Sequence, residues 1–264
     1  MFKKSMVACL LAAGAGMAPL AYADDAKPAE APKSDWTFAG NFALSSEYLY
    51  RGIAQSDHKP AVSGGFDLSH VSGFYIGNWD SSISWISGEL VQPAANTSAP
   101  IEMDFYGGYK FEVVKDWTLD VGLLQYYYPV AGTKPSTNPN TLEVYVDIAW
   151  GPATLKYSDS TTTLFGVPGS KNSGYVDLSL NFDVGGGFSI QPHVGHQDIK
   201  GPASSIGSYT DYKLAVAKDL NGWSLSVGYY GTNAKDAGYV PLSGPSAGTN
   251  LGKGRGVVSI SKSF

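Results

Sequence analysis

The segment GVVSISKSF, residues 256–264, alternates apolar and polar side chains and stops on an aromatic residue. Because successive side chains of a strand point to opposite faces, Val258, Ile260 and Phe264 share one face, and Val257 lies with the serines on the other. Free chain ends usually fray, whereas the last strand of an outer-membrane barrel pairs with the first strand and closes the sheet. The segment therefore predicts a transmembrane β-barrel.

The first residues predict export. Lys3 and Lys4 precede an apolar run over residues 7–20, and Ala21-Tyr22-Ala23 before Asp24 forms an A-x-A cleavage site. We expect a signal peptide over residues 1–23, cut between Ala23 and Asp24. A transmembrane anchor is the alternative, but the run is too short to span a bilayer and contains glycine and proline. Residues 24–35 are polar and rich in Ala and Pro, which predicts a disordered periplasmic tail.

Composition narrows the class of protein further. The single cysteine, Cys9, lies in the predicted signal peptide, so the mature chain has no thiol to form a disulfide or bind a metal. Mean hydropathy is −0.10, which suits a barrel with alternate residues facing a polar interior. Loss of Lys3 and Lys4 takes the formal charge from −5 to −7, which argues against nucleic-acid binding.

Twelve segments from residue 36 onward have strand-like alternation, with no charge on the apolar face in mid-strand. Two positions break the pattern: Gly77, where the apolar phase changes toward Trp79 and Trp85, and Pro192, which removes a ladder hydrogen bond. We expect a β-bulge at each. The apolar faces of the twelve segments span residues 36–44, 62–68, 74–85, 101–111, 117–123, 142–150, 153–157, 176–182, 188–194, 212–216, 223–229 and 256–264.

The connections between these segments alternate short and long. This rhythm is typical of an up-and-down outer-membrane barrel with short periplasmic turns and long extracellular loops, whereas a Greek-key sandwich has no reason to keep it. We therefore predict an all-β, antiparallel barrel of about 12 strands over residues 36–264. The short connections are 71–72, 112–116, 151–152, 184–187 and 219–221; the long ones are 51–60, 87–100, 129–140, 160–173, 198–208 and 231–255.

Aromatic residues gather near both kinds of connection, which predicts one girdle at each membrane interface. The girdle beside the short turns comprises Trp36, Phe74, Phe111, Trp117, Trp150, Phe182, Phe188, Trp223 and Phe264. The girdle beside the long loops comprises Tyr48, Tyr50, Trp85, Tyr126, Tyr127, Tyr128, Tyr209 and Tyr229.

The sequence resembles the TorF family of bacterial putative porins, most strongly over residues 42–110. The resemblance lies in SSEYLYRGIAQSD at 45–57, GGFD at 64–67, GFYIGNW at 73–79 and EMDFYGGY at 102–109. It implies an outer-membrane barrel and a channel. It implies no particular substrate, and the family supplies no catalytic residues.

The polar faces of the strands are expected to line the barrel interior, where acids outnumber bases. A weak preference for cations is one interpretation; the other is that the carboxylates pair with neighbouring Lys and Arg and only hydrate a narrow interior. The candidate lining residues are Arg51, Asp67, Glu102, Asp104, Lys110, Asp120, Glu143, Asp147, Lys156, Asp177, Asn181, Gln191, His193, Asp211 and Lys213.

Arg51 follows the first strand and has two interpretations. We favour a hydrated loop arginine, because loop charges usually remain in water. If the loop folds inward instead, Arg51 would form a constriction with a carboxylate of the interior.

A membrane-embedded enzyme, such as a barrel lipase or deacylase, is the rival class. Such an enzyme needs a Ser-His pair, oriented by an Asn, Asp or Glu, at the lipid face. The four histidines are His58, His70, His193 and His196, and none makes a convincing pair with a serine: His70 and Ser72 run into a short periplasmic turn, a poor position for acting on lipid of the outer leaflet. His193 and His196 point to opposite faces of a strand, which disfavours a metal site. We expect no enzyme activity and no cofactor. A structural or adhesive barrel acting through its loops is the third class.

The sequence thus predicts a porin-like channel in the outer membrane of a Gram-negative bacterium, passing small hydrophilic solutes by passive diffusion. Its expected partners are outer-membrane lipid, the solutes themselves and the barrel-assembly machinery, which would engage the strand ending at Phe264. The sequence names neither the solute nor the oligomeric state.

Overall fold

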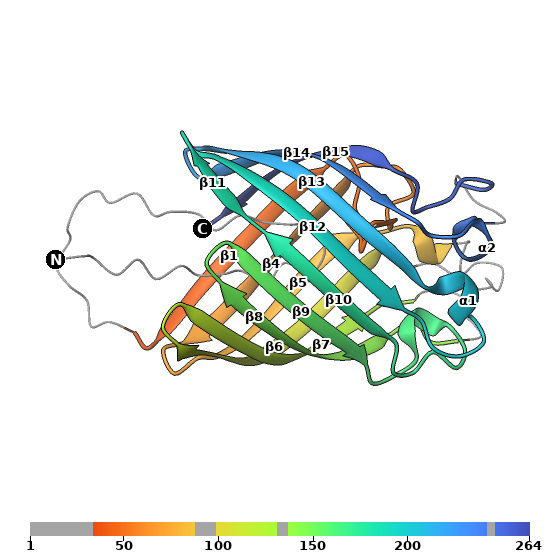
Figure 1. The fold of residues 1–264 in the computed structure, drawn as a ribbon, viewed down its shortest axis with the longest axis horizontal. Helices are drawn as coiled ribbons and strands as arrows, with labels where there is room; N and C mark the ends of the chain where they lie inside the picture. The colour runs from red at the N-terminus through yellow and green to blue at the C-terminus, as the bar shows by residue number, and fades with distance from the viewer. Residues whose placement is uncertain (1–33, 88–98, 131–136, 242–245) are drawn as a thin grey trace.

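The chain forms a closed antiparallel β-barrel (Figure 1). The structure is a computed structural model that describes residues 34–87, 99–130, 137–241 and 246–264. The predicted signal peptide and most of the predicted tail lie outside the described residues.

Twelve strands make up the barrel wall, as the alternation predicts. One of them is recorded as two pieces, β10 and β11. The wall strands are β1 (Trp36–Ser45), β4 (Ala61–His70), β5 (Phe74–Ser82), β6 (Ile101–Val114), β7 (Trp117–Tyr127), β8 (Thr141–Trp150), β9 (Ala153–Ser160), β10 (Gly174–Leu180) with β11 (Phe182–Gly185), β12 (Phe188–Asp198), β13 (Tyr209–Leu220), β14 (Trp223–Thr232) and β15 (Arg255–Ser263).

Each strand pairs with its neighbours in the chain, and the ring closes where β1 pairs with β15. Leu44 lies opposite Ile260, and Gly40 and Phe264 exchange backbone hydrogen bonds of 2.8 and 3.0 Å. The pairing of β10 with β12 completes the circuit on the other side. Every wall strand therefore has two partners, so the sheet has no free edge.

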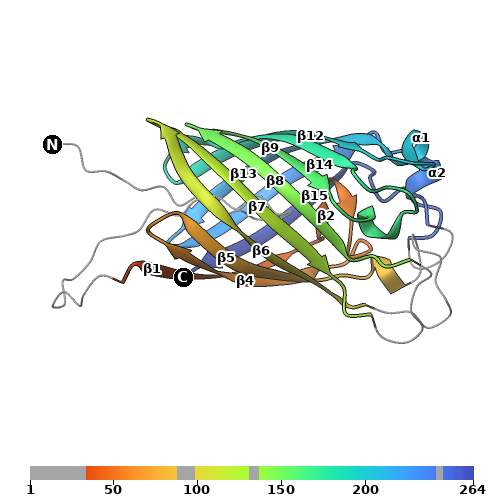
Figure 2. The same cartoon turned by 90° about the horizontal axis from the view of Figure 1, so that it is seen from below.

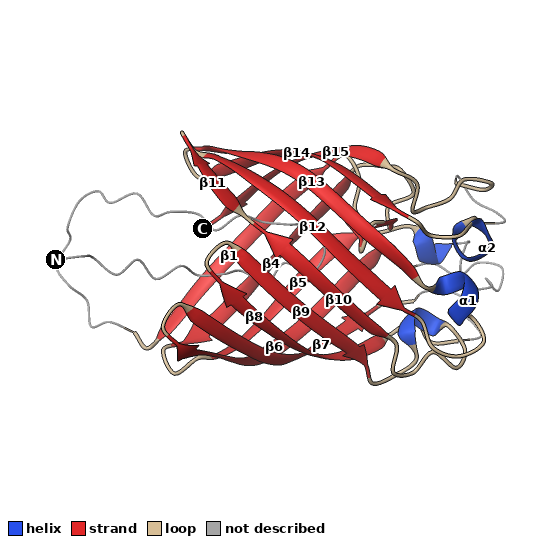
Figure 3. Cartoon of the chain, in the orientation of Figure 1, coloured by secondary structure: helices blue, strands red, loops and turns tan. Residues whose placement is uncertain are grey.

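Short turns lie at one end of the barrel and long loops at the other, which we call the short-turn rim and the long-loop rim (Figures 2 and 3). The turn between β13 and β14 is tight because Asn221 and Gly222 both adopt positive φ, 56° and 86°, as a type I′ hairpin requires. Within the described part of the chain, four short helices lie at the long-loop rim: η1 (Trp85–Ser87), η2 (Leu164–Gly166), α1 (Ser204–Gly207) and α2 (Asp236–Tyr239). None of the helices among the described residues is long and apolar enough to cross a bilayer.

Apolar side chains cover the outside of the barrel and polar ones face inward. On β7, Leu123 is 51% exposed whereas Asp120 is fully buried, and on β8, Val146 is exposed whereas Glu143 is buried. The apolar face of each wall strand is thus exposed on the outside of the barrel, where a water-soluble domain would not leave it. The predicted girdle beside the short turns is confirmed as a set of exposed aromatic side chains, from Trp36 and Phe74 to Phe264.

Neither predicted bulge is present. Strand β5 keeps an unbroken register with both neighbours, and Trp79 is buried because it points into the barrel, where its ring packs edge-on against Tyr48. Strand β12 is continuous through Pro192, and the register with its neighbour is the same before and after it. The ladder is interrupted on that neighbour instead, at Asn181, between β10 and β11.

Candidate functional site

The long connection between β1 and β4 folds into the barrel and forms a small hairpin, β2 (Leu49–Tyr50) and β3 (Ile53–Ala54). All four strand residues are apolar or aromatic, and all four are buried. An outward loop would leave them in water, so their burial favours the inward fold of the loop. Arg51 and Gly52 form the tip, with φ of 47° and 77°. A Cβ on Gly52 would lie 2.5 Å from Cγ2 of Thr232, so both the backbone conformation and the space favour glycine.

Arg51 spans the interior from this tip to the far side of the ring. Its Nη2 lies 2.8 and 3.0 Å from the two carboxylate oxygens of Glu143 on β8, and its Nη1 donates to Oε1 of Gln197 on β12 at 2.5 Å. The guanidinium also stacks over the rings of Tyr50 and Tyr175, at 4.7 and 4.1 Å from their centroids. Arg51 therefore has charge, hydrogen-bond and cation–π partners at once.

The expectation of a hydrated loop arginine is wrong, since the Arg51 side chain is only 7% exposed. Burial alone would lower the pKa of Arg51, but the Glu143 carboxylate and nearby tyrosines raise it, so the net pKa lies well above its usual value. The guanidinium therefore stays charged. The alternative interpretation, contact with an interior carboxylate, describes the geometry that the structure has.

Tyrosines fix the hairpin to the wall. Tyr48 donates a hydrogen bond to Oε1 of Glu102 and Tyr128 donates one to Oε2, both at 2.6 Å. The hydroxyls of Tyr50 and Tyr126 lie 2.8 Å apart. Burial first, and then the charge of Glu102, raise the pKa of Tyr128 well above its usual value, which keeps this phenol a donor.

The predicted girdle beside the long loops is therefore mostly wrong. Only Tyr127 and Tyr229 are exposed on the outer wall, at 42% and 52%. The others are buried: they belong to the inward face of a strand, to the inward loop or, for Trp85 and Tyr128, to segments at the long-loop rim. The buried members are Tyr48, Tyr50, Trp85, Tyr126, Tyr128 and Tyr209.

A charged cluster holds the base of the hairpin. The Glu47 carboxylate accepts from Arg255 at 2.7 Å and lies 2.9 Å from Nδ1 of His58, which also contacts Arg255. Ser246 bonds Asp57 from another loop. The loop is thus tied to the wall at its base and at its tip.

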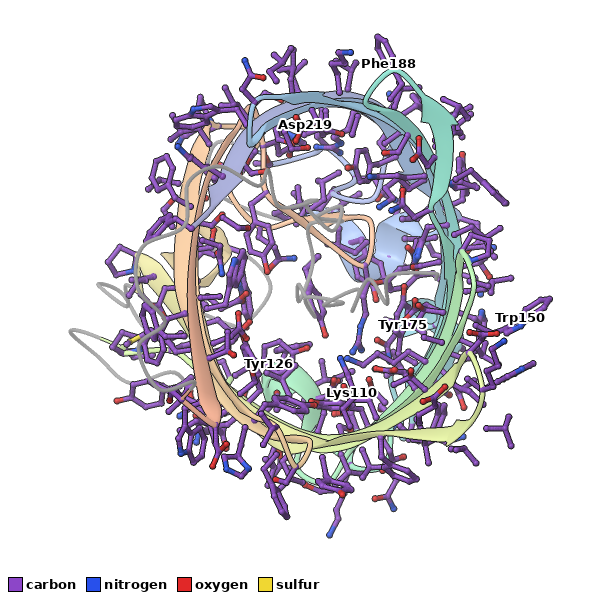
Figure 4. The ribbon with its side chains drawn as sticks, turned by 90° about the vertical axis from the view of Figure 1, so that its left-hand side faces the viewer. Lys110, Tyr126, Trp150, Tyr175, Phe188 and Asp219 are labelled. Atoms are coloured by element: carbon purple, nitrogen blue, oxygen red, sulfur yellow. The ribbon has the colours of Figure 1, made fainter. Side chains whose placement is uncertain are left out.

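Most of the predicted lining residues lie on the inward face and form local clusters. Figure 4 shows Lys110, Tyr126 and Tyr175 pointing into the barrel, and Trp150 and Phe188 pointing away from it. Lys110 lies 3.4 Å from Asp120, and Lys156 lies over the ring of Tyr145 at 4.0 Å. The buried carboxylates and amide are Glu102, Asp104, Asp120, Glu143, Asp147, Gln191 and Asp211. Those that remain partly exposed are Asp67, Asp177 and Asn181, together with His193 and Lys213.

Several of these carboxylate oxygens lack a hydrogen-bond partner among the described residues. Both oxygens of Asp104 are of this kind, as is one oxygen each of Asp67 and Asp147. The other oxygen of Asp67 accepts from Tyr106 at 2.7 Å. The protein thus leaves part of the hydrogen-bonding capacity of these buried carboxyl groups unused.

The structure also brings together a set that the sequence analysis missed. Ser179 Oγ lies 2.9 Å from Nδ1 of His193, and Nε2 of His193 lies 2.9 Å from Asp211. The sequence offers His70 and Ser72 as neighbours, whereas Ser179 meets His193 because the β10–β12 register places the two directly opposite each other. Ser179 also lies inside a strand paired on both sides, so the surrounding backbone N–H groups are committed to strand pairing and not free for an oxyanion.

At the long-loop rim a cavity of about 470 Å³ lies against the hairpin. Its aromatic lining residues are Tyr50, Trp85, Tyr128, Phe165, Tyr209 and Tyr239. Phe165 has φ 45° and ψ 37°, a left-handed conformation that is strained for an aromatic residue, and its ring meets Tyr50 and Tyr126 edge-on. We call this the loop-end cavity. Among the described residues, no group of three or more acidic, His or Cys side chains is arranged to hold a metal ion.

A closed 12-stranded barrel with an apolar outer wall, a polar inner wall and an inward loop has the architecture of the outer-membrane porins. Two solved porins share this fold: the KdgM porin in complex with disordered oligogalacturonate, at 8% identity, and the NanC porin, at 10% identity. Each has a TM-score of 0.51, covering 86% of this chain and 99% of the porin.

The chain belongs to a family described as bacterial protein of unknown function (Gcw_chp), whose model matches residues 29–264. No curated protein matches the sequence. The family description does not carry the name TorF, so the resemblance to that family stays a prediction.

Proposed function

We propose that the protein is a bacterial outer-membrane channel through which small hydrophilic solutes and ions diffuse passively. The observation that carries the proposal is the division of the closed wall into an apolar outside and a charged, hydrogen-bonding inside. An apolar band suits lipid, and a polar interior suits water and solutes. Diffusion along such an interior needs no cofactor. Likeness to porins supports the fold of the proposal, and its function rests on the distribution of side chains.

We further propose a weak preference for cations. The predicted lining set contains eight carboxylates and four Lys or Arg residues, a difference of −4. This excess of carboxylates would give the interior the negative potential that a cation prefers. The KdgM porin was solved with an acidic oligosaccharide, and the charge of the interior here supports the opposite sign of preference.

Within this channel, the Arg51–Glu143 pair is the proposed constriction. It crosses the interior between the hairpin tip and β8, and Tyr50, Tyr175 and Gln197 hold it in place. Solutes would pass around the hairpin or wait for its tip to move. Size and charge selection would therefore be set at this level of the barrel.

Planar-bilayer recording of the purified protein tests the proposal. Discrete openings are expected, with a reversal potential in a KCl gradient that shows preference for K⁺. Arg51→Ala should raise the unitary conductance, because it removes the side chain that spans the interior. Lys200→Ala, which removes an exposed loop lysine, is the matched control and should leave conductance unchanged.

Two results would count against the proposal in different ways. A folded barrel that gives no openings contradicts the channel and favours a structural or adhesive role for the loops. Openings with anion preference contradict only the cation preference, and equal conductance of Arg51→Ala and the parent contradicts only the constriction.

A further inference from the structure

The loop-end cavity differs in chemistry from the rest of the interior. Its volume of about 470 Å³ falls within the roughly 300–1,000 Å³ of small-molecule sites. Besides its aromatic rings, its wall contains the aliphatic side chains of Ile53, Leu164, Val167 and Ile199. The inner wall below the cavity is dominated by carboxylates and lysines. The passage of hydrophilic solutes therefore does not explain an apolar cavity at the long-loop rim.

Much of the hydrogen-bonding capacity of this cavity is already used within the protein. Tyr128 donates to Glu102, and Tyr239 donates to the Gly207 carbonyl, both at 2.6 Å. The Gln197 amide accepts from Arg51 and donates to the Gly174 carbonyl. A ligand rich in hydroxyls would therefore lose hydrogen bonds to water and find few partners here. Trp85 is an exception, since its buried Nε1–H has no partner among the described residues.

Phe165 adds a second, independent observation. A strained left-handed backbone places its ring among Tyr50, Trp85, Tyr126 and Tyr128, with centroid distances of 5.1–6.4 Å and steep interplanar angles. Backbone strain of this kind persists only where surrounding packing maintains it, and it is frequent at ligand sites. The aromatic cluster therefore presents ring edges and faces against which the ring of a ligand could pack.

We propose that the loop-end cavity binds a neutral, mainly apolar small molecule that contains a ring and at most one or two hydrogen-bonding groups. Recognition comes from apolar contact and edge-to-face packing with the aromatic wall. Tyr50 and Gln197 line the cavity and also hold Arg51, so a bound molecule lies against the hairpin tip. Its binding should therefore reduce ion current, a consequence that rests on the proposed channel function.

The probe for the test is 1-naphthol, a neutral aromatic alcohol, with glucose as the hydrophilic comparison. Titration calorimetry of the full barrel in lipid nanodiscs should give a saturable heat with 1-naphthol beyond that of empty nanodiscs, and none with glucose. Partitioning of 1-naphthol equal to that of empty nanodiscs, or saturable binding of glucose instead, would overturn the proposal.

Ile206→Asp is the informative variant, because Ile206 lines the cavity and is 39% exposed, so the barrel should fold without it. A carboxylate against the ring should weaken 1-naphthol binding by about tenfold, since part of its hydration is lost. Val71→Asp, at a 75% exposed site on the short-turn rim, is the matched control and should bind as the parent does.

Equal affinity of Ile206→Asp and the parent would place the ligand elsewhere and overturn the assignment. Binding is measured without any current, so its failure is distinct from failure of the channel. Saturable binding in a barrel that never opens would keep the cavity and refute the channel, whereas current without binding would do the reverse.

Discussion

Arg51 and Glu143 lie 92 residues apart in the chain, yet their side chains meet at 2.8 Å inside the barrel, with only 7% and 1% of each exposed. A pair removed from water in this way is costly to form and more costly to break on one side, because the remaining charge stays buried. The pair therefore fixes where the hairpin tip sits. It also links a loop between the first wall strands to the opposite half of the ring.

Breaking one half of this pair should destabilise the barrel. Arg51→Ala or Glu143→Ala alone is expected to lower the free energy of unfolding by about 3–5 kcal/mol, because either leaves an uncompensated buried charge. The double variant should recover much of that loss. Urea unfolding of the protein in lipid vesicles measures it, and a double variant as unstable as the sum of the singles would contradict a direct pairing.

Gly52→Ala should disturb the hairpin tip through both strain and a clash. A left-handed φ costs a non-glycine residue about 1–2 kcal/mol, and the new Cβ would also meet Thr232 at 2.5 Å. Gly248→Ala is the control, since Gly248 has nearly the same φ, 78°, with nothing near the added Cβ. The midpoint temperature of thermal unfolding should fall further for Gly52→Ala than for Gly248→Ala. Equal decreases in the two variants would show that the close approach of Gly52 to β14 has no effect.

Tyr128→Phe should lower the free energy of unfolding by about 1.5–3 kcal/mol. The substitution removes a hydrogen bond to a buried carboxylate and leaves one oxygen of Glu102 without a partner. Its neighbour Tyr127 lies on the outer wall at 42% exposure, so Tyr127→Phe is a control for the same chemical change. Chemical denaturation of both variants compares them. A larger loss in Tyr127→Phe would contradict the inward placement of Tyr128.

Leu123→Arg tests whether the outer wall contacts lipid. Leu123 is 51% exposed near the middle of β7, and an arginine at the bilayer midplane costs about 2–4 kcal/mol. Val71→Arg, on a short turn, should be tolerated. Folding yield into vesicles reports both, and equal yields would indicate that residue 123 faces water.

Alternation along the strands predicts most of this fold, and the same rule explains where the interpretation went wrong. Val121 and Leu123 assign the odd positions of β7 to the outside, so Tyr126 must point inward, as the structure shows. Its nearness to a long loop predicts instead a place beside Tyr127 in the outer girdle, and that prediction is wrong. Trp79 has the inward parity of β5 for the same reason, and the apparent change of phase at Gly77 is an inward aromatic that covers the hairpin.

The alternation of apolar and polar residues along the strands does not predict the position of Arg51. A loop has no period, and its direction depends on partners such as Glu143 and Gln197, which lie 92 and 146 residues away. The one local signal was composition: YLYRGIA carries too many apolar side chains for a loop that stays in water. Likewise, Ser179 meets His193 only through strand register, which spacing along the chain does not reveal.

The joint between β1 and β15 has a mechanical consequence. Its ladder runs from Gly40, which bonds Phe264, to Ser46, which bonds Val258, whereas the β1–β4 ladder covers all ten residues of β1. The β1–β15 pairing is thus shorter than the β1–β4 pairing, so β1 should separate from β15 before it separates from β4 under force or heat. The hairpin follows β1 in the chain, and Glu47 at its base pairs with Arg255 of β15, so separation of the two strands would also release the hairpin that carries Arg51.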